Sequence, residues 1–382
     1  MIDLSAVPVI DNHCHAYTRP TAALDVPAYR RLFSEVREPK AATEHIQNAV
    51  YYRWALKELG RVLGCAAAEG PVLERRAALS QRDLVALLLR DAPIEAKLID
   101  TGLGGAEFLS VAEMRELTGI RVEWMLRIEI LAERLIPDSD GFDHFLARFD
   151  AALEEARAGG VVALKSIAAY RTGLQIAPVA PAVASAAFHA VQAVDTRARV
   201  PGEGRLRLAN KPLIDFLVCR ALLYAAALGM PMQFHTGYGD PDTDLRLGNP
   251  LHLRTLFEDP SFAAAPIVML HESYPFTREA AYLAAVYENA YLDISYSVPF
   301  LDYHELLSCT HQALGVAPWS KVLYSSDGFG IPEHAWLGAL HGRRVLAHAL
   351  QAKIDAGELD GAEAMEAAGA ILHDNSRRVY RL

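Results

Sequence analysis

The sequence predicts an α/β fold, a (β/α)8 TIM barrel with helical insertions at the C-terminal face of its strands. Two observations support this prediction. Short apolar runs of strand character recur along the chain, and segments with a 3.6-residue apolar period separate them. Strands that alternate with helices pair in parallel, and eight of them is the number in this barrel. The chain of 382 residues, 52% of them hydrophobic, is long enough to bury such a core.

The strands and helices can be placed in chain order. The expected strands are Val7–Asp11, Ala96–Asp100, Arg121–Ile128, Val161–Leu164, Pro231–Phe234, Pro266–Leu270, Ala290–Ile294 and Lys321–Tyr324. The clearest helical patterns are Phe142–Ala158, Lys211–Leu228, Arg278–Tyr287 and Leu301–Leu314. The glycine-rich stretch 101–105 lacks the G-x-G-x-x-G spacing, so a dinucleotide-binding fold is not indicated.

Two intervals between strands are longer than a simple βα unit needs. Segments 16–95, after the first strand, and 175–212, after the fourth, carry helical patterns such as Ala41–Leu63 and Ser80–Leu89. Both follow the carboxyl end of a strand, where barrel enzymes build their sites, so we expect helical lids over a pocket within one domain, 1–382. The alternative is that they serve packing or subunit contacts.

Composition excludes several classes of partner. The net charge of −10, from 37 basic and 47 acidic residues without a dense basic run, argues against nucleic acid and anionic membranes. No apolar stretch is long enough to span a bilayer, and the start of the chain does not resemble a signal peptide. Four scattered cysteines fit reduced thiols. We therefore expect a cytoplasmic homo-oligomer that acts on a small-molecule substrate.

Ligand-type side chains stand at the ends of the expected strands. Alternate residues of a strand point to the same side, so His13 and His15 share a face and Cys14 takes the other. The fourth, fifth, sixth and eighth strands are followed by Lys165, His235, His271 and Asp327. Barrel residues at these positions are typically catalytic. Imidazole and carboxylate together suit Zn²⁺, although Mn²⁺, Fe²⁺ and Ni²⁺ accept the same ligand types.

This set of six residues resembles the metal-binding pattern of the amidohydrolase superfamily, metal-dependent (β/α)8 hydrolases. The stretches 163–174, 233–240 and 324–328 are similar to an amidohydrolase-related branch found alone or fused to a glutamine synthetase-like domain. The similarity extends from the first strand to the terminal residues 375–380, so it covers the whole chain.

The resemblance implies roles for the six residues. Lys165, carbamylated by CO2, would bridge two metal ions, with His13, His15 and Asp327 on the more buried ion and His235 and His271 on the other. A water activated by the metal would be the nucleophile. Asp327 would take its proton and deliver it to the leaving amine. In the alternative, a single ion is held by His13, His15, His235 and Asp327, with His271 as an acid or orienting group.

Further residues near the same face are candidates for substrate binding and for orienting the ligands. Arg127, Tyr170 and Arg171 could bind a substrate carboxylate, with His252 and Arg254 as weaker candidates. Arg127 and Glu129 could instead pair with each other. The strand-end residues Asp100, Asp293 and Ser295 are expected to orient the ligating imidazoles.

The expected function is metal-dependent hydrolysis of a carbon–nitrogen (amide) bond in a small, carboxylate-bearing molecule. The branch fused to glutamine synthetase-like domains suggests glutamyl or related amides by analogy. Two alternatives remain: a nonoxidative decarboxylase with a single metal ion on the same scaffold, and a metal-binding barrel that serves signalling without turnover.

Overall fold

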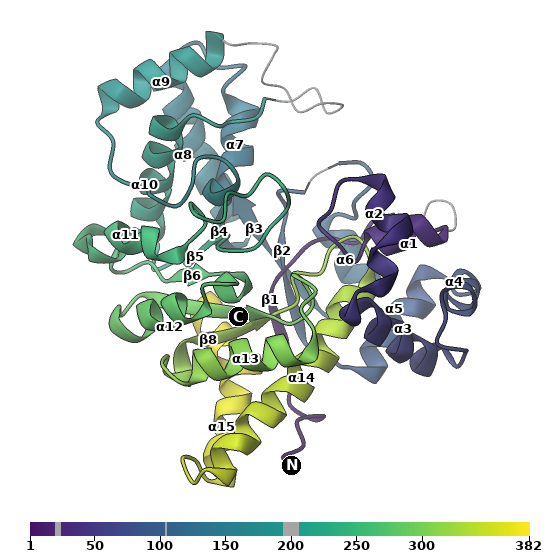
Figure 1. The fold of residues 1–382 in the computed structure, drawn as a ribbon. Helices are drawn as coiled ribbons and strands as arrows, with labels where there is room; N and C mark the ends of the chain where they lie inside the picture. The colour runs from purple at the N-terminus through teal and green to yellow at the C-terminus, as the bar shows by residue number, and fades with distance from the viewer. Residues whose placement is uncertain (20–23, 104, 194–205) are drawn as a thin grey trace.

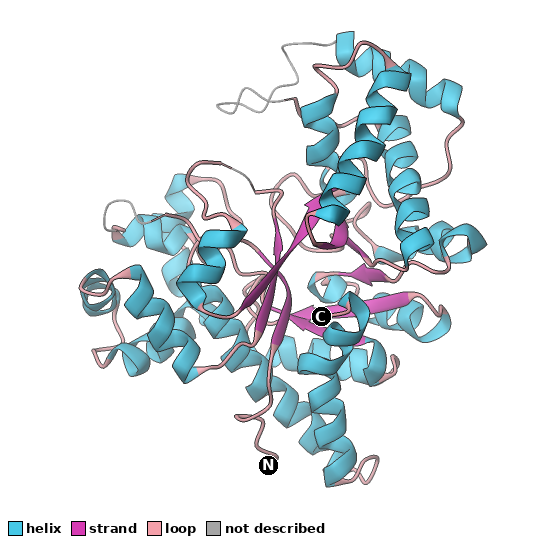
Figure 2. Ribbon diagram, turned by 180° about the vertical axis from the view of Figure 1, so that it is seen from behind, coloured by secondary structure: helices cyan, strands magenta, loops and turns pink. Residues whose placement is uncertain are grey.

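Eight parallel strands in sequential order form the sheet at the centre of the computed structural model. The structure describes residues 1–19, 24–103, 105–193 and 206–382. Helices (cyan in Figure 2) surround the strands (magenta). The strands are β1 Ile10–Cys14, β2 Ala96–Asp100, β3 Arg121–Arg127, β4 Val161–Ser166, β5 Met232–Phe234, β6 Ile267–Met269, β7 Ala290–Ser295 and β8 Val322–Ser325. The predicted TIM barrel and all eight of its strands are confirmed.

The first strand is the one whose predicted bounds differ most. It begins at Ile10 rather than Val7, because Pro8 has no N–H to donate to a ladder. The strand ends at Cys14, beyond its predicted end at Asp11.

The ring of strands closes between β8 and β1, immediately beyond the end of β8. The backbone N–H of Asp327 donates to the carbonyl of His13 at 2.9 Å, and that of His15 donates to Gly328 at 2.8 Å. Two of the predicted ligand-bearing segments are therefore joined directly by their backbones.

The helices alternate with the strands along the chain (Figure 1). The helices before β4 are α1 Val26–Arg31, α2 Pro39–Glu44, α3 Val50–Leu63, α4 Glu69–Ala77, α5 Gln81–Asp91, α6 Val111–Thr118, α7 Ile128–Leu135 and α8 Phe142–Ala158. Those after β4 are α9 Pro181–Ala193, α10 Lys211–Leu228, α11 Arg254–Glu258, α12 Thr277–Val286, α13 Tyr303–Leu314, α14 Pro332–Asp355, α15 Gly361–Gly369 and α16 Asn375–Tyr380. The predicted helix 41–63 is divided, because a short 3-10 turn, Ile46–Asn48, separates α2 from α3.

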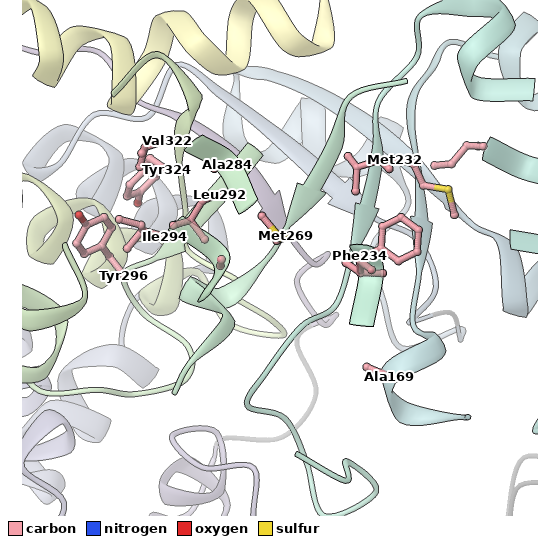
Figure 3. Close-up of a cluster of buried hydrophobic side chains, with 14 of the residues drawn as sticks. Ala169, Met232, Phe234, Met269, Ala284, Leu292, Ile294, Tyr296, Val322 and Tyr324 are labelled. Atoms are coloured by element: carbon pink, nitrogen blue, oxygen red, sulfur yellow. The ribbon is translucent and has the colours of Figure 1, made fainter. Parts of the chain in front are cut away.

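The outward faces of the strands pack against the helices as one apolar layer. Met232 and Phe234 on β5, and Leu292 and Ile294 on β7, alternate along their strands and are fully buried. Figure 3 shows these side chains in one cluster with Val322 and Tyr324 of β8. This period of two leaves the intervening residues, such as Gln233, to face the barrel interior.

A smaller apolar cluster fills the barrel itself. Leu98, Met125, Val268 and Leu323 belong to it, together with Tyr380 of α16. Helix α16 contacts both β1 and β8. The last helix therefore brings a tyrosine from outside the ring of strands into contact with the barrel core.

The segments predicted as insertions form two helical groups. Helices α1 to α5 lie on one flank in Figure 1, and α9 lies beside α8 and α10 at another. Parts of both predicted segments, 20–23 and 194–205, lie outside the described residues. Helix α5 packs against α14 and α6, so the first group is anchored to the barrel wall.

Two further observations concern the helices and the cysteines. Within the described ranges, no helix has the length and apolar character required to cross a bilayer. The four cysteines, Cys14, Cys65, Cys219 and Cys309, are all free thiols.

Candidate metal centre

A cavity of about 720 Å³ opens at the carboxyl ends of the strands. Nine of the ten residues predicted to form the site line it, and they are His13, His15, Arg127, Lys165, Tyr170, Arg171, His235, His271 and Asp327. The other lining residues are Glu35, Arg37, Leu103, Ile167, Arg207, Asp240, Asp242 and Phe329. The exception is His252, whose Nε2 lies 2.9 Å from the carbonyl of Arg246 and which is not part of this lining.

The end of strand β1 brings three polar residues, Asn12, His13 and His15, into the site region through a shift of register. Its pairing with β2 is irregular between Asp11 and Cys14. As predicted, His13 and His15 face the cavity, and the Cys14 thiol points away to the carbonyl of Leu98. The irregularity also brings Asn12 inward, so that its side chain reaches Asp293 at 2.7 Å. Such bulges commonly re-aim side chains beside active sites.

Hydrogen bonds donated by Nδ1 fix how His13 and His15 present their rings. Nδ1 of His15 lies 3.2 Å from the backbone carbonyl of Asp100, an obligate acceptor, so Nδ1 carries the proton. Nδ1 of His13 lies 2.7 Å from Oε1 of Gln233, which can only accept. Burial, and then the charge of Lys165, lowers the pKa of His13 to about 4. At neutral pH Nε2 of His13 therefore carries a lone pair.

These lone pairs converge on one carboxylate. Oδ1 of Asp327 lies 3.2 Å from Nε2 of His13 and 3.5 Å from Nε2 of His15. Nζ of Lys165 lies 3.4 Å from Nε2 of His13, at a distance similar to these contacts. Three lone-pair atoms facing one another repel unless a cation lies among them, so these residues fit a divalent ion. Groups able to hold a metal ion are His13, His15 and Asp100, and His13, His271 and Asp327.

The remaining ligand-type side chains complete the site. Nδ1 of His271 lies 3.3 Å from Oδ2 of Asp327 and 3.2 Å from Oγ of Ser295. Nε2 of His235 is buried without a hydrogen-bond partner among the described residues. Burial lowers the pKa of both His235 and His271, which keeps them neutral and able to bind a metal. Asp293 accepts from the backbone N–H of His271 at 3.1 Å, and it reaches the imidazole only through Ser295, whose Oγ donates to Oδ1 of Asp293 at 3.0 Å.

The backbone takes uncommon conformations at two of these residues. His271 has φ 63° and Asp327 has φ 47°, both in the left-handed region. Non-glycine residues rarely adopt it, and such strain gathers at functional sites. Gly237, two residues after His235, also has a positive φ, and a Cβ there would meet the backbone of Ser273 at 2.4 Å. The His-Thr-Gly motif therefore requires its glycine for a close approach of two loops.

Arg127 has a different partner from the one considered in the sequence. Its Nη2 lies 2.6 Å from Oδ2 of Asp100, and its Nε also contacts that carboxylate. Glu129 instead accepts from Oγ of Ser166 at 2.6 Å and from the N–H of Ile167 at 3.0 Å. The suggested Arg127–Glu129 pair is wrong, because α7 begins at Ile128 and the alternation of the strand ends at Arg127.

Tyr170 and Arg171 stand beside the imidazoles. The ring centroid of Tyr170 lies 4.1 Å from that of His235. The side chain of Arg171 is only 6% exposed, and its one ion-pair partner among the described residues is Glu133, at 3.4 Å. Nε of Arg171 is buried without a partner among the residues that the structure describes. Judged by these residues, Arg171 is the least satisfied guanidinium on the cavity wall.

The sequence did not predict the charged rim that the insertions form with the loop after β5. Arg37, between α1 and α2, binds Asp242 at 2.8 Å and Asp240 at 2.9 Å, and Arg207 binds Asp242 at 3.1 Å. Glu35 lies in the same wall. No periodic pattern links these positions to the strand ends. Gln233, in contrast, could have been found, since it shares a strand face with His235.

Comparisons with known proteins match the chain along its length. A family model described as Amidohydrolase matches residues 136–382. Protein fluG of Emericella nidulans is 29% identical over 402 aligned residues, which cover 98% of this chain. The chain spans only 46% of the length of that curated relative.

Solved structures share the whole architecture. A putative metal-dependent hydrolase from Lactobacillus casei is 30% identical, covers 100% of this chain and 98% of its own, and superposes with a TM-score of 0.85. A uronate isomerase from Thermotoga maritima is 14% identical, covers 98% of this chain and 95% of its own, and has a TM-score of 0.68. The second likeness shows the fold alone.

Proposed function

Because this chain belongs to the amidohydrolase family, whose members are metal-dependent hydrolases, we propose that it cleaves a carbon–nitrogen (amide) bond in a small substrate that carries a carboxylate. The observation that supports a metal-dependent reaction is the convergence of Nε2 of His13 and Nε2 of His15 on Oδ1 of Asp327. A bound cation would stabilise such a cluster of acceptors.

The residues that would hold the metal are those whose free ring nitrogens or carboxylate oxygens face the cavity. His13, His15 and Asp327 would hold one ion, and His235 and His271 a second. Zn²⁺ suits this mixture of imidazole and carboxylate. The chemistry that a bound divalent ion supplies is polarisation of the amide carbonyl and a lower pKa for the attacking water.

Asp327 is the proposed proton carrier. It lines the cavity, and its Oδ2 contacts His271 while its Oδ1 faces His13. The attacking water would lose a proton to this carboxylate, and the same proton would then pass to the leaving nitrogen as the carbon–nitrogen bond breaks. The products are a carboxylic acid and an amine, so the proton count balances with one water consumed.

Lys165 is the proposed bridge between two ions after carbamylation. Its amine is 1% exposed, and burial lowers its pKa to about 8. A larger fraction of neutral amine is therefore present near neutral pH than for an exposed lysine. The neutral amine would add to CO2 and release one proton, which replaces a cation with the carboxylate of a carbamate. A negative bridge suits two divalent ions better than an ammonium does.

Arg171 is the proposed site for the substrate's carboxylate. Its buried Nε lacks a partner among the described residues, and its guanidinium lines the same cavity as the ligands. A guanidinium edge matches a carboxylate in two parallel hydrogen bonds. The notion of a glutamyl or related amide comes from the resemblance to chains fused with glutamine synthetase-like domains.

The test is a direct search for hydrolysis. Zinc-reconstituted protein, with bicarbonate present, is incubated with N-acyl and γ-glutamyl amides, and amine release is measured beside an Asp327→Asn variant. We expect release by the native chain and its loss in the variant. Equal turnover by the variant would refute the assigned role of Asp327. Release of CO2 from an aryl acid, without any amide hydrolysis, would favour a decarboxylase instead.

A further inference from the structure

A buried chain of hydrogen bonds joins the last helix to the metal centre. The hydroxyl of Tyr380, on α16, lies 2.6 Å from Nε2 of Gln233. Oε1 of the same Gln233 side chain lies 2.7 Å from Nδ1 of His13. Tyr380 is 3% exposed and Gln233 is fully buried, so water does not compete for these contacts.

Each hydrogen bond in this series has one possible direction, because it is determined by oxygen atoms that can only accept. Nε2 of Gln233 lies 2.8 Å from the backbone carbonyl of Asn12, which only accepts. The amide nitrogen of Gln233 must therefore lie on that side, and its oxygen must face His13. Since that oxygen only accepts, Nδ1 of His13 must be the donor.

Asn12 determines the other end in the same way. Its Nδ2 donates to the backbone carbonyl of Tyr324 at 2.6 Å and to the carboxylate of Asp293 at 2.7 Å. Its Oδ1 must therefore face the Tyr380 hydroxyl, 2.9 Å away, and accept the proton of that hydroxyl. The lone pair of the phenol oxygen remains free to accept from Gln233.

We propose that Tyr380 is a positioning residue for the metal centre, which acts through Gln233 to hold His13 in the tautomer whose Nε2 is free to bind the ion. The proposal rests on the metal-binding part of the proposed function. The hydroxyl gives the second N–H of Gln233 an acceptor at 2.6 Å, closer than Oδ1 of Asn12 at 3.1 Å. Without it the amide loses its shorter contact and is held less firmly in the orientation that His13 needs.

A matched pair of variants tests this role in the full-length chain. Tyr380→Phe removes the phenol hydroxyl that contacts Gln233. Tyr51→Phe removes an equally buried hydroxyl, which lies 2.8 Å from Oγ of Ser297 and outside the lining of the cavity. Both variants should lower the thermal unfolding midpoint by similar amounts, because each loses one buried hydrogen bond.

Two measurements separate a positioning role from a merely structural one. Zinc affinity, from competition with a chromophoric chelator, should fall about tenfold for Tyr380→Phe and stay within about twofold for Tyr51→Phe. In the metal-free chain, labelled with ¹⁵N-histidine, His13 should show its proton on Nδ1 in the native protein and in Tyr51→Phe. In Tyr380→Phe the His13 signals should shift toward a mixture of tautomers.

The outcomes separate this inference from the proposed function. An unchanged His13 tautomer, or an unchanged zinc affinity, in Tyr380→Phe would overturn the role of Tyr380. A native chain that binds no zinc would refute the proposed metal-dependent function, while the tautomer of the metal-free chain still decides whether Tyr380 orients His13.

Discussion

Nζ of Lys165 lies 3.4 Å from Nε2 of His13, and both side chains are 1% exposed. An amine at this position is either a charged ammonium beside neutral imidazoles or a covalently modified, uncharged nitrogen. Burial lowers its pKa to about 8, which increases the fraction of the reactive neutral amine relative to an exposed lysine.

Carbamylation of Lys165 is therefore a first prediction. With ¹³C-bicarbonate and zinc, the native chain should show one carbamate resonance that is absent in Lys165→Met. Lys97 provides an internal control: it is equally buried, but its Nζ lies 3.5 Å from Oδ2 of Asp11 and its pKa is raised despite burial, so it stays protonated. A carbamate that persists in Lys165→Met would contradict the assignment.

The second prediction concerns Asp327. At matched zinc occupancy, Asp327→Asn should lower kcat for amide hydrolysis by about 10² to 10⁴, the range of a lost general acid–base group. The measurement is the rate of amine release. Asp259→Asn, at an exposed turn, is the matched control and should retain the native rate. A comparable loss of kcat in both variants would contradict the role of Asp327 as the proton carrier.

The third prediction concerns Arg171. Arg171→Met should raise KM for a carboxylate-bearing amide roughly tenfold to a hundredfold, because a charge-assisted contact contributes about 1.5–3 kcal/mol. The value of kcat should change little. For a substrate whose carboxylate is replaced by an amide, the native and variant chains should have the same KM. Arg246→Met is the control, since that side chain is 89% exposed. A fall in kcat alone would assign Arg171 to another role.

The fourth prediction is that the metal stabilises the fold. An ion that binds only the native chain stabilises it by about 2.7 kcal/mol at a hundred times its Kd, which corresponds to a rise of a few degrees in Tm. Chelation should reverse the rise. His235→Ala should reduce it, and His348→Ala, outside the lining of the cavity, should not. The readout is calorimetry at fixed zinc, and an equal response by both variants would count against His235 as a ligand.

The fifth prediction follows from Glu35. Burial, then the charges of Asp327 and Asp240, raises its pKa to about 7 against the opposing effect of Arg37. The folded metal-free chain therefore holds this proton more tightly than the unfolded chain does, so stability should fall as pH rises from about 4.5 to about 7.

Glu35→Gln removes this dependence. At pH 8 the metal-free variant should be more stable than the native chain by up to about 3 kcal/mol, and at pH 4 the two should agree. Urea unfolding at both pH values measures the difference. The exposed neighbour Glu38, changed to Gln, supplies the control. A native chain that gains stability between these pH values relative to Glu35→Gln would reverse the sign and contradict the prediction.

The sequence predicted those parts of the molecule that follow periodic rules. Apolar runs located the eight strands, and the first polar residue beyond several of them, such as His235 and His271, lies in the cavity. These positions are predictable because a barrel places the carboxyl ends of its strands on one face.

Other features depended on contacts that no local pattern encodes. The register shift between Asp11 and Cys14 turns Asn12 inward, although strict alternation would give it the face opposite His13. Glu35 reaches the cavity from an insertion whose path is determined by tertiary packing. Arg127 pairs with Asp100 on the neighbouring strand. The parallel register of β2 and β3 brings these two residues together, although they are distant in sequence.

The joint between β1 and β8, formed by backbone hydrogen bonds of residues 13 and 15 with residues 327 and 328, links closure of the barrel to metal binding. The side chain of Asp11 and the backbone of Ser326, 315 positions apart, meet there, beside the backbone contacts of His13 and His15. Contacts so distant along the chain form late, since a long loop must close before they contribute. An ion held by both sides of this joint would act as a cross-link between the first and last strands. Loss of the ion and opening of the ring would then be a single coupled event.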